Sequence, residues 1–258
     1  TTNEDTAVNI GGQISYAPTD SDGSENVSQV SISGIPSGST IGITPSGSAS
    51  AIYNAGTGIL TVTSSNPDLV AAAAEIRATL DTLTYQPPLH HGNDVSLTVS
   101  ATVTDADGST AVQTGTHTVD VVPVADAPTA PAASTAVNED TATVFGTNVT
   151  YALVDGDGSE SVTSVIVTGF PGGSTVGYTA GGATVTAIAG GYEITGSAAD
   201  IRTALNTFSY TAPSDSDGNV NLSVTVETTD SNGDTATTTS SHGLNVAAIA
   251  DAPSLAVT

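Results

Sequence analysis

The chain repeats itself, and this repeat limits its architecture more than any other feature of the sequence. NEDTA at 3–7 returns at 138–142, an offset of 138 − 3 = 135 residues, and SGIPSGSTIG at 33–42 returns as TGFPGGSTVG at 168–177. AAEIRATLDTLTY at 73–85 returns as AADIRTALNTFSY at 198–210, now at an offset of 198 − 73 = 125. Two homologous modules therefore account for the chain, and we predict boundaries at 1–127 and 128–258, with the last residues beginning a linker or the first strand of a next repeat.

The second module is 135 − 125 = 10 residues shorter than the first. The offset changes between about position 43 and position 72, and a deletion of this size is expected in a hairpin or loop rather than in a core strand. Within each module, alternating apolar residues are separated by Gly, Asn, Asp and Pro turns, which predicts a β-sandwich. In the first module we expect strands near 13–18, 27–33, 40–44, 49–53, 59–63, 82–86, 95–104 and 110–121.

One segment breaks the strand pattern. NPDLVAAAAEIRATLDTL, from position 66, has Pro67 near its start, an alanine-rich interior and aliphatic residues at near-helical spacing. It predicts a short helix that crosses from one sheet to the other, and the second module keeps a shorter version around Ala198 to Asn206. The predicted fold class is all-β: two tandem Greek-key sandwiches of immunoglobulin-like or cadherin-like type, each with one short crossover helix.

The charge balance excludes several classes of partner. The chain has 26 acidic residues against two basic ones, Arg77 and Arg202, and it has neither lysine nor cysteine. Nucleic acids and anionic membranes need basic patches, so neither is expected as a partner. No run of about 18 apolar residues exists, so direct membrane insertion is not expected. We expect the two arginines to be solvated or paired with a nearby acid, and the chain to be an excerpt from a longer protein.

The acids gather in short Asp-Gly turns. DSDGSE at 20–25 returns as DGDGSE at 155–160, giving Asp20, Asp22 and Glu25 in the first module and Asp155, Asp157 and Glu160 in the second. Alternate carboxylates can lie on one side of a turning backbone, and the following glycine can curl the chain around a cation. Oxygen ligands in a flexible loop suit Ca²⁺ better than Mg²⁺. The simpler alternative is that Asp-Gly is good turn chemistry.

Further acidic turns strengthen the cation hypothesis. TDADGST at 104–110 contains Asp105 and Asp107, and its counterpart TDSNGDT at 229–235 contains Asp230, Asn232 and Asp234. The linker VADAP contributes Asp126, and its copy contributes Asp251. Two charges about 4 Å apart repel by roughly 4 kcal/mol at an effective dielectric constant near 20, so packed carboxylates need a counterion. Strand direction predicts that one Ca²⁺-binding junction between modules gathers Asp126, Asp155, Asp157, Glu160 and Asp230.

The NED segment has two readings. If residues 129–137 form the first strand of the second module, Glu139 lies at the far end and serves the next junction, so that Glu4 serves the junction within this chain. If those residues are only linker, Glu139 lies at the near end. We favour the first reading. Asp215 and Asp217 form an extra acidic turn where the first module has His90 and His91, and we interpret both segments as solvated loops.

The order of these motifs resembles a known family. NEDTA, DxDGSE, GxPxGxT, a helix leading to LTYQPP or FSYTAP, TDxDG and ADAP resemble the tandem cadherin-like, immunoglobulin-like repeats of giant type I-secreted RTX adhesins of Gram-negative bacteria. The resemblance covers essentially the whole chain. It implies an extracellular β-sandwich extender on the cell surface, in adhesion and biofilm, whose partners are the neighbouring repeats and whose junctions hold Ca²⁺. It supports Glu4, Asp126, Asp155, Asp157 and Asp230 as ligands, while Asn232 departs from the pattern.

Three other functions remain as alternatives. The chain could be the subunit of a surface filament or S-layer, in which DAPSLAVT at 251–258 donates a strand to the next copy. It could bind carbohydrate or ice, for which Tyr53, Tyr178 and Tyr192 are the candidates, since the chain has no tryptophan. Catalysis is least favoured, because neither a phosphate-binding loop nor a serine nucleophile motif is present, and no small-molecule substrate is expected.

Overall fold

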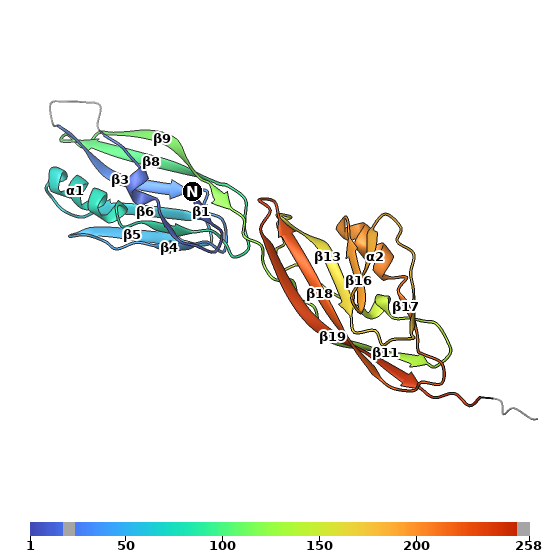
Figure 1. The fold of residues 1–258 in the computed structure, drawn as a ribbon. Helices are drawn as coiled ribbons and strands as arrows, with labels where there is room; N and C mark the ends of the chain where they lie inside the picture. The colour runs from blue at the N-terminus through green and yellow to red at the C-terminus, as the bar shows by residue number, and fades with distance from the viewer. Residues whose placement is uncertain (18–23, 252–258) are drawn as a thin grey trace, which may run out of the picture. The chain divides into compact units, whose positions relative to one another are not determined.

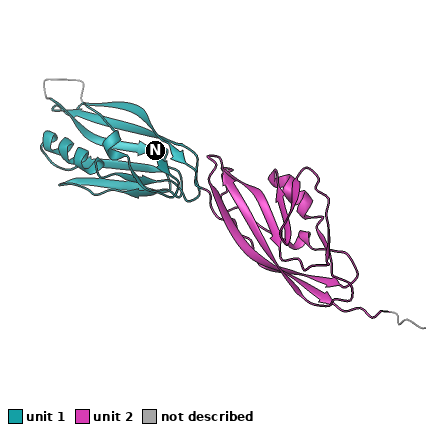
Figure 2. Cartoon of the chain, in the orientation of Figure 1, with its two compact units in different colours: residues 1–124 teal, residues 125–258 magenta. Residues whose placement is uncertain are grey.

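The structure, a computed structural model, describes residues 1–17 and 24–251. The chain divides into two compact units, unit 1 at Thr1–Val124 and unit 2 at Ala125–Thr258 (Figure 2). Each unit contains a larger and a smaller sheet with an apolar core between them, together with one α-helix (Figure 1). Most of the ordered structure is strand, so the predicted all-β class with one short helix in each unit is confirmed. Among the described residues, neither helix is long and apolar enough to cross a membrane.

In unit 1 the larger sheet has five strands, and a smaller sheet of three short strands packs over it. The strands of the larger sheet, in spatial order, are β5 (Ala49–Asn54), β6 (Ile59–Ser64), β3 (Glu25–Ser33), β8 (Val95–Asp105) and β9 (Thr110–Val119). Those of the smaller sheet are β2 (Val8–Asn9), β7 (Thr84–Gln86) and β4 (Thr40–Gly42). A short parallel pair joins β1 (Thr2–Asn3) to β10 (Val121–Val122).

Unit 2 repeats this plan with one addition. Its larger sheet contains, in spatial order, β11 (Ala133–Asn138), β19 (Thr235–Ala247), β18 (Val220–Asp230), β13 (Glu160–Thr168), β16 (Gly191–Thr195) and β15 (Thr184–Ile188). Its smaller sheet contains β12 (Thr143–Val144), β17 (Ser209–Thr211) and β14 (Thr175–Gly177). The addition is β11, which pairs in parallel with β19 over six residues, whereas its counterpart β1 is only two residues long.

The α-helices form where the sequence predicts them. Helix α1 (Leu69–Leu80) begins at Asp68, whose side chain accepts hydrogen bonds from the amides of Val70 and Ala71. Helix α2 (Ala198–Leu205) begins at Ser197. Such caps satisfy amides that lack partners within the helix. Each helix connects a strand of the larger sheet to a strand of the smaller one, and the predicted crossover is therefore confirmed.

One predicted strand is wrong. Residues 13–17 form no strand: Gly11–Gln13 form a short 3₁₀ helix, η1, and residues 14–17 follow without regular structure, while position 18 lies outside the described residues. The other seven predicted strands are present, with ends that differ by at most two residues. The strand predicted at 13–18 does not form because the chain packs closely against helix α1 here: a Cβ atom at Gly11 would lie 1.6 Å from the carbonyl oxygen of Leu80. The alternation of apolar and polar residues in this segment therefore reflects packing against the end of helix α1.

Each arginine holds the 3₁₀ segment of its own unit in place. The guanidinium of Arg77 donates to the carbonyl oxygens of Ile14 and Gly11, each at 2.6 Å, and pairs with Asp81 at 2.5 Å. In unit 2 Arg202 donates to the Val149 carbonyl oxygen at 2.7 Å. The Arg202 guanidinium also lies 4.0 Å from the centre of the Tyr151 ring. Both arginines are structural clamps, and within the part of the chain that the structure describes only Arg77 pairs with an acidic side chain.

The ten residues missing from unit 2 are divided between three places. Ala51 pairs with Val62 in unit 1, and Val185 pairs with Ile194 in unit 2, so the offset is 185 − 51 = 134 on the first strand of this hairpin and 194 − 62 = 132 on the second. One residue is therefore lost before β15, and the β15–β16 hairpin is two residues shorter than β5–β6. The remaining seven residues are lost between β16 and the end of helix α2, which has eight residues against twelve in α1. These changes spare the paired core strands.

Candidate functional site

An acidic set lies where the linker enters unit 2, and we call it the N-end set: Asp126, Asp155, Asp157, Glu160 and Asp230. Glu160 is the first residue of β13 and Asp230 is the last residue of β18, and the sheet ladder pairs these two residues directly. Asp155 and Asp157 lie in the turn that leads into β13. The register of two antiparallel strands thus brings residues seventy positions apart to one end of the sheet.

The linker is fixed to this set by hydrogen bonds. The backbone amide of Asp126 donates to Glu160 Oε1, and the hydroxyl of Thr228 donates to the carbonyl oxygen of Asp126 at 2.7 Å. Asp126 therefore reaches the N-end set through its backbone as well as through the charge of its side chain. The charges of Asp126, Asp155 and Asp230 act on Glu160, and Asp157 lies in the same turn as Asp155. The role of these five residues as metal ligands stays a prediction.

Three carboxylates of the N-end set are buried. Asp155, Glu160 and Asp230 are only 6%, 5% and 6% exposed. Glu160 Oε2 and Asp230 Oδ2 are buried and have no hydrogen-bond partner among the described residues. Unpaired carboxylate oxygens in such positions are costly unless a cation neutralises them. The chain has no lysine, and the single arginine of unit 2, Arg202, is committed to the Val149 carbonyl oxygen and the Tyr151 ring.

The electrostatics of Glu160 reflect this crowding. Burial raises the pKa of the Glu160 carboxyl above its ordinary value, and the hydrogen bond from the Asp126 amide only partly opposes that effect. The charges of Asp155, Asp126 and Asp230 raise the same pKa further. All of these donors are hard oxygens, so the set fits a cation such as Ca²⁺ and does not fit a soft transition metal.

Several aspartate and asparagine side chains in the turns accept hydrogen bonds from backbone amides of the same turn. Asp157 Oδ1 accepts the amide of Ser159 at 2.9 Å, and Asp107 Oδ1 accepts the amide of Ser109 at 2.8 Å. In the same way Asn232 Oδ1 accepts the amide of Asp234 at 2.9 Å. An asparagine can make this turn as well as an aspartate can. The departure at Asn232 therefore leaves the turn itself unchanged.

Asp230 is oriented by its own turn. Its Oδ1 accepts the amides of Asn232, Gly233 and Asp234 at 3.0, 2.9 and 2.9 Å. With Oδ1 saturated by three donors, Oδ2 is the oxygen that remains available to a ligand. The β18–β19 turn thus uses one carboxylate oxygen of Asp230 and leaves the other, Oδ2, as its possible ligand atom in the N-end set.

The corresponding residues of unit 1 are more exposed. Glu25 pairs with Asp105 across β3 and β8, as Glu160 pairs with Asp230, but both are half-buried where their counterparts are buried. The Asp105 carboxylate accepts the amide of Ala106 at 2.5 Å, and Asp107 is exposed. Asp20 and Asp22 lie outside the described residues. The counterpart of Asp126 would be at position 126 − 135 = −9, which precedes Thr1.

The two NED glutamates lie at the other end of their units. Glu4 Oε1 accepts the backbone amide of Val124, and Glu139 Oε1 accepts the backbone amide of Ile249. Both glutamates are buried, at 3% and 5% exposure. Residues 133–138 form strand β11, as the favoured reading required, and this strand carries Glu139 to the end of unit 2 where the chain leaves it.

A second acidic set surrounds Glu139, and we call it the C-end set: Glu139, Asp140, Asp215 and Asp251. One carboxylate oxygen each of Asp140, Asp215 and Asp251 lie within 4.8 Å of one another, and all three side chains are exposed. The negative charge of Asp140 raises the pKa of Asp251, with a further contribution from Asp215. The sequence interpretation placed Asp215 in a solvated loop and overlooked Asp140. Their spacing along the chain gave no signal, because a turn and a strand end bring them together.

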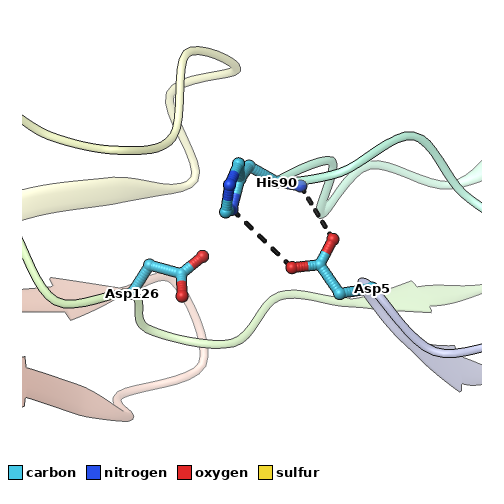
Figure 3. Close-up of side chains that lie close together, drawn as sticks. All are labelled: Asp5, His90 and Asp126. Carbon is cyan, nitrogen blue, oxygen red and sulfur yellow. Dashed lines mark hydrogen bonds and ion pairs between the residues drawn. The ribbon is translucent and has the colours of Figure 1, made fainter. Parts of the chain in front are cut away.

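The equivalent end of unit 1 contains a histidine where unit 2 has Asp215. Asp5 accepts the amide of His90 at 2.9 Å, and its second carboxylate oxygen lies 3.7 Å from the His90 ring nitrogen (Figure 3). Asp5, His90, Asp140 and Asp215 are the four non-glycine residues with positive φ among the described residues, at 56° to 58°. Residues other than glycine rarely adopt this backbone conformation, so the turns at this end are locally constrained in both units.

The tyrosines proposed for sugar binding are packed in unit 2. The Tyr178 ring is stacked on Phe208 at 5.1 Å, and the Tyr192 ring meets Tyr178 edge-on at 5.4 Å. Tyr192 is also in edge contact with Phe208 and Phe170. Tyr178 is 41% exposed, so one ring of this aromatic cluster reaches the surface.

Comparisons with known proteins find only distant similarity. No protein-family model matches the chain, and no curated protein matches it. Among solved structures the chain is similar to the protocadherin GammaB4 extracellular domain (12% identity, TM-score 0.34, covering 81% of this chain and 28% of that one). It is also similar to human CDH23 EC21-23 (14% identity, TM-score 0.36, covering 82% of this chain and 59% of that one) and to BspA_C_WT (8% identity, TM-score 0.29, covering 83% and 84%). The chain thus spans less than two thirds of the length of the first two. The strand order itself defines each unit as a two-layer β-sandwich.

Proposed function

We propose that this protein is a pair of extracellular, non-catalytic extender modules of a large surface adhesin, in which Ca²⁺ bound by the acidic sets stiffens the array. The observation that carries the proposal is the pair of buried oxygens Glu160 Oε2 and Asp230 Oδ2, which have no hydrogen-bond partner within a set of five acidic residues. A cation offsets the repulsion that would otherwise oppose folding of unit 2.

The position of the linker supports a shared role for neighbouring units. Glu4 binds the amide of Val124, and Glu160 binds the amide of Asp126, two residues further along the chain. A residue spans at most about 3.3–3.6 Å, so the covalent chain keeps the two glutamate-binding amides close at any angle between the units. We infer that Ca²⁺ bound by the N-end set fixes this linker, with Glu4 contributing from the preceding unit.

The same logic extends to the ends of the chain. Glu139 and Asp251 belong to the C-end set and would serve the junction with a following repeat, as Glu4 and Asp126 serve the one within this chain. Asp20, Asp22, Glu25, Asp105 and Asp107 would serve a junction with a preceding repeat. The resemblance of the sequence to RTX adhesin repeats supports an array on the surface of a Gram-negative bacterium after type I secretion, with the neighbouring repeats as its partners.

Extracellular Ca²⁺ modules bind with dissociation constants of about 10⁻⁴ to 10⁻³ M, which would leave the sites largely empty in a cytosol and filled outside the cell. The chain would then be secreted in a looser form and would stiffen where Ca²⁺ is abundant.

Calorimetric titration of the full chain with Ca²⁺, after dialysis against EGTA, tests the proposal. We expect saturable binding, a weaker response to Mg²⁺, and loss of a site in Glu160→Gln. The matched control is Glu227→Gln, because Glu227 lies on β18, half-buried and outside both acidic sets. Absence of Ca²⁺ binding, or equal binding by the Glu160→Gln variant and the wild type, would contradict the proposal. Small-angle scattering with and without EGTA then tests the stiffening.

A further inference from the structure

The turn between β18 and β19 (Figure 1) contains Asn232 followed by Gly233, the only asparagine–glycine pair in the 258 residues. Asparagine is a thermally labile residue, because the backbone nitrogen that follows it can attack its side-chain carbon and displace ammonia. A following glycine favours this attack, since it carries no side chain and allows the widest range of backbone conformations. The sequence thus places its most labile asparagine in this turn.

The pair is open to solvent. Asn232 and Gly233 are both exposed, and a Cβ atom added at Gly233 would meet no described atom within 4 Å. Water can therefore reach the groups that the reaction changes. Asn54 is a natural comparison, because it is also exposed and its Oδ1 accepts the amide two residues further on at 3.0 Å. It is followed by Ala55 and not by glycine.

Unit 1 has an aspartate in the same turn. Asp107 is the counterpart of Asn232, since 232 − 125 = 107, and Gly108 and Gly233 have similar positive φ values of 89° and 97°. In each turn the glycine amide donates to the backbone carbonyl oxygen three residues earlier, at 2.9 Å in unit 1 and 3.2 Å in unit 2. Asp107 and Asn232 also accept the amide two residues further on in the same way. An aspartate at position 232 would therefore fit this turn.

Asp230 restrains the turn in the folded unit. Its Oδ1 accepts the amides of Asn232, Gly233 and Asp234 at 3.0, 2.9 and 2.9 Å. Attack on the side chain of Asn232 requires the Gly233 nitrogen to turn towards that side-chain carbon. Three hydrogen bonds to one carboxylate oxygen fix the backbone on both sides of this nitrogen, so the reaction requires the turn to open.

We propose that Asn232 is a modification site at which the chain converts asparagine to aspartate without an enzyme, at a rate set by the hydrogen bonds to Asp230. The Gly233 nitrogen forms a bond to Cγ of Asn232, and the bond from Cγ to the side-chain nitrogen breaks. That nitrogen leaves as ammonia with the former amide proton of Gly233. Water then opens the cyclic imide at Cγ, which restores the peptide N–H and leaves a carboxylate. The net reaction consumes one water and releases one ammonia.

The folded turn favours one of the two possible products. Water can also open the imide at the backbone carbonyl, which routes the chain through the side chain and lengthens it by a methylene group. The turn is closed by the pair Thr229 and Thr235 and by the bond from the Asp230 amide to the Asp234 carbonyl oxygen at 3.0 Å. A longer backbone would not fit this closure, so aspartate with the normal backbone is the expected product in the folded unit.

The product would change the charge beside the N-end set, and this consequence rests on the proposed function. A carboxylate at position 232 would lie two residues from Asp230, whose Oδ2 is the possible ligand atom. Asn232→Asp should bind Ca²⁺ at least about threefold more tightly than the wild type, because an added negative charge attracts a divalent cation even through screening solvent. Unchanged Ca²⁺ affinity would overturn this consequence, whereas reaction rates in EGTA decide the modification itself.

The direct test incubates the 258-residue chain at mildly alkaline pH in EGTA, with and without urea, and follows each asparagine by peptide mass spectrometry. In urea, Asn232 should convert at least about tenfold faster than Asn54, because only Asn232 precedes a glycine. Without urea, Asn232 should convert at least about tenfold more slowly than in urea, the factor that one hydrogen bond to a charged group contributes. Equal rates at Asn232 and Asn54 in urea, or equal rates at Asn232 with and without urea, would overturn the proposal.

Two variants test the role of Asp230. Asp230→Ala removes the acceptor of the three amides and should speed conversion of Asn232 at least about tenfold in the folded unit. Asp230→Asn keeps Oδ1 as an acceptor and should convert at nearly the wild-type rate. Slow hydrogen exchange at Val224 and Val226, in the middle of β18, shows that unit 2 remains folded. If Asp230→Ala unfolds unit 2, Asp230→Asn decides: a rate near that of the wild type supports protection by Oδ1, and an equally accelerated rate overturns it.

Discussion

The two units have the same acidic sequence before β3 and β13, but the acidic residues at the paired strand ends differ in burial. In unit 2, Glu160 and Asp230 are buried beneath a linker whose Asp126 amide binds Glu160. In unit 1, Glu25 and Asp105 have the same ladder pairing and are half-buried. The acidic motif supplies the carboxylates, and the linker segment that precedes β13 supplies their burial.

The same segment has a second role in unit 2. The Asp126 carbonyl oxygen accepts the Thr228 hydroxyl beside the N-end set, and Ala130, further along the segment, packs against the apolar core. A single stretch of linker therefore contributes both to the candidate metal site and to the core of unit 2.

The largest expected difference is in the response to Ca²⁺. Ion binding at 100 times the dissociation constant adds about 2.7 kcal/mol to the folded state, which raises the melting temperature of a unit of this size by roughly 10 °C. We expect the calorimetric transition of unit 2 to rise by this amount when Ca²⁺ replaces EGTA, and that of unit 1 to rise less. Equal shifts in the two transitions would remove the distinction between the two acidic turns.

Replacing either arginine should lower the free energy of unfolding of its unit by a similar amount, although the two arginines have different partners. Arg202→Leu and Arg77→Leu each remove charged hydrogen bonds to backbone carbonyls, which we expect to cost about 2 kcal/mol in the unit concerned. Asp81→Asn removes only the exposed ion pair that unit 2 lacks, and it should cost at most about 0.5 kcal/mol. Urea unfolding of the variants measures all three. A large cost for Asp81→Asn would mean that the ion pair, rather than the carbonyl contacts, holds the η1 segment of unit 1.

The variants Glu160→Gln and Glu25→Gln compare how the two glutamates contribute to the stability of their units in the absence of metal. The pKa of Glu160 is raised by burial, so folded unit 2 binds a proton more tightly than the unfolded chain does. Metal-free unit 2 should therefore gain stability as pH falls through the folded pKa of Glu160 and lose it as pH rises. In EGTA at pH 7, Glu160→Gln should stabilise unit 2 by about 1 kcal/mol, because it removes a buried charge. Glu25→Gln should have little effect on unit 1, and stabilisation of both units would contradict the difference in burial.

The smallest expected effect concerns His242. Burial lowers the pKa of this histidine, so the folded unit holds the neutral ring while the unfolded chain takes up a proton below a pH of about 6.5. The contribution of His242 to stability should therefore be lost as pH falls. The stability difference between wild type and His242→Gln, followed by thermal melting from pH 7.5 to 5.5 in EGTA, should narrow on acidification. A constant difference would show that the ring titrates alike in both states.

Much of this organisation follows from the sequence because repeats and turns are local signals. The offset of 135 residues identifies the modules, and the Asp-Gly turns lie at the strand ends where the pattern predicts them. The alanine-rich segment after Pro67 is a helix that begins at its aspartate cap. The strand predicted at 13–18 is the exception, because contact between Gly11 and the end of α1 outweighs local alternation.

The sequence by itself determined the repeat, the acidic composition and the kind of ligand that the turns offer, since these depend on residue type and spacing. Only the tertiary structure decided which acids are buried, because burial depends on strands and linkers that are distant in the chain. It placed Glu139 beside Ile249 and brought Asp140, Asp215 and Asp251 together. Packing of the linker against the sheets is a long-range effect, and no short motif encodes it.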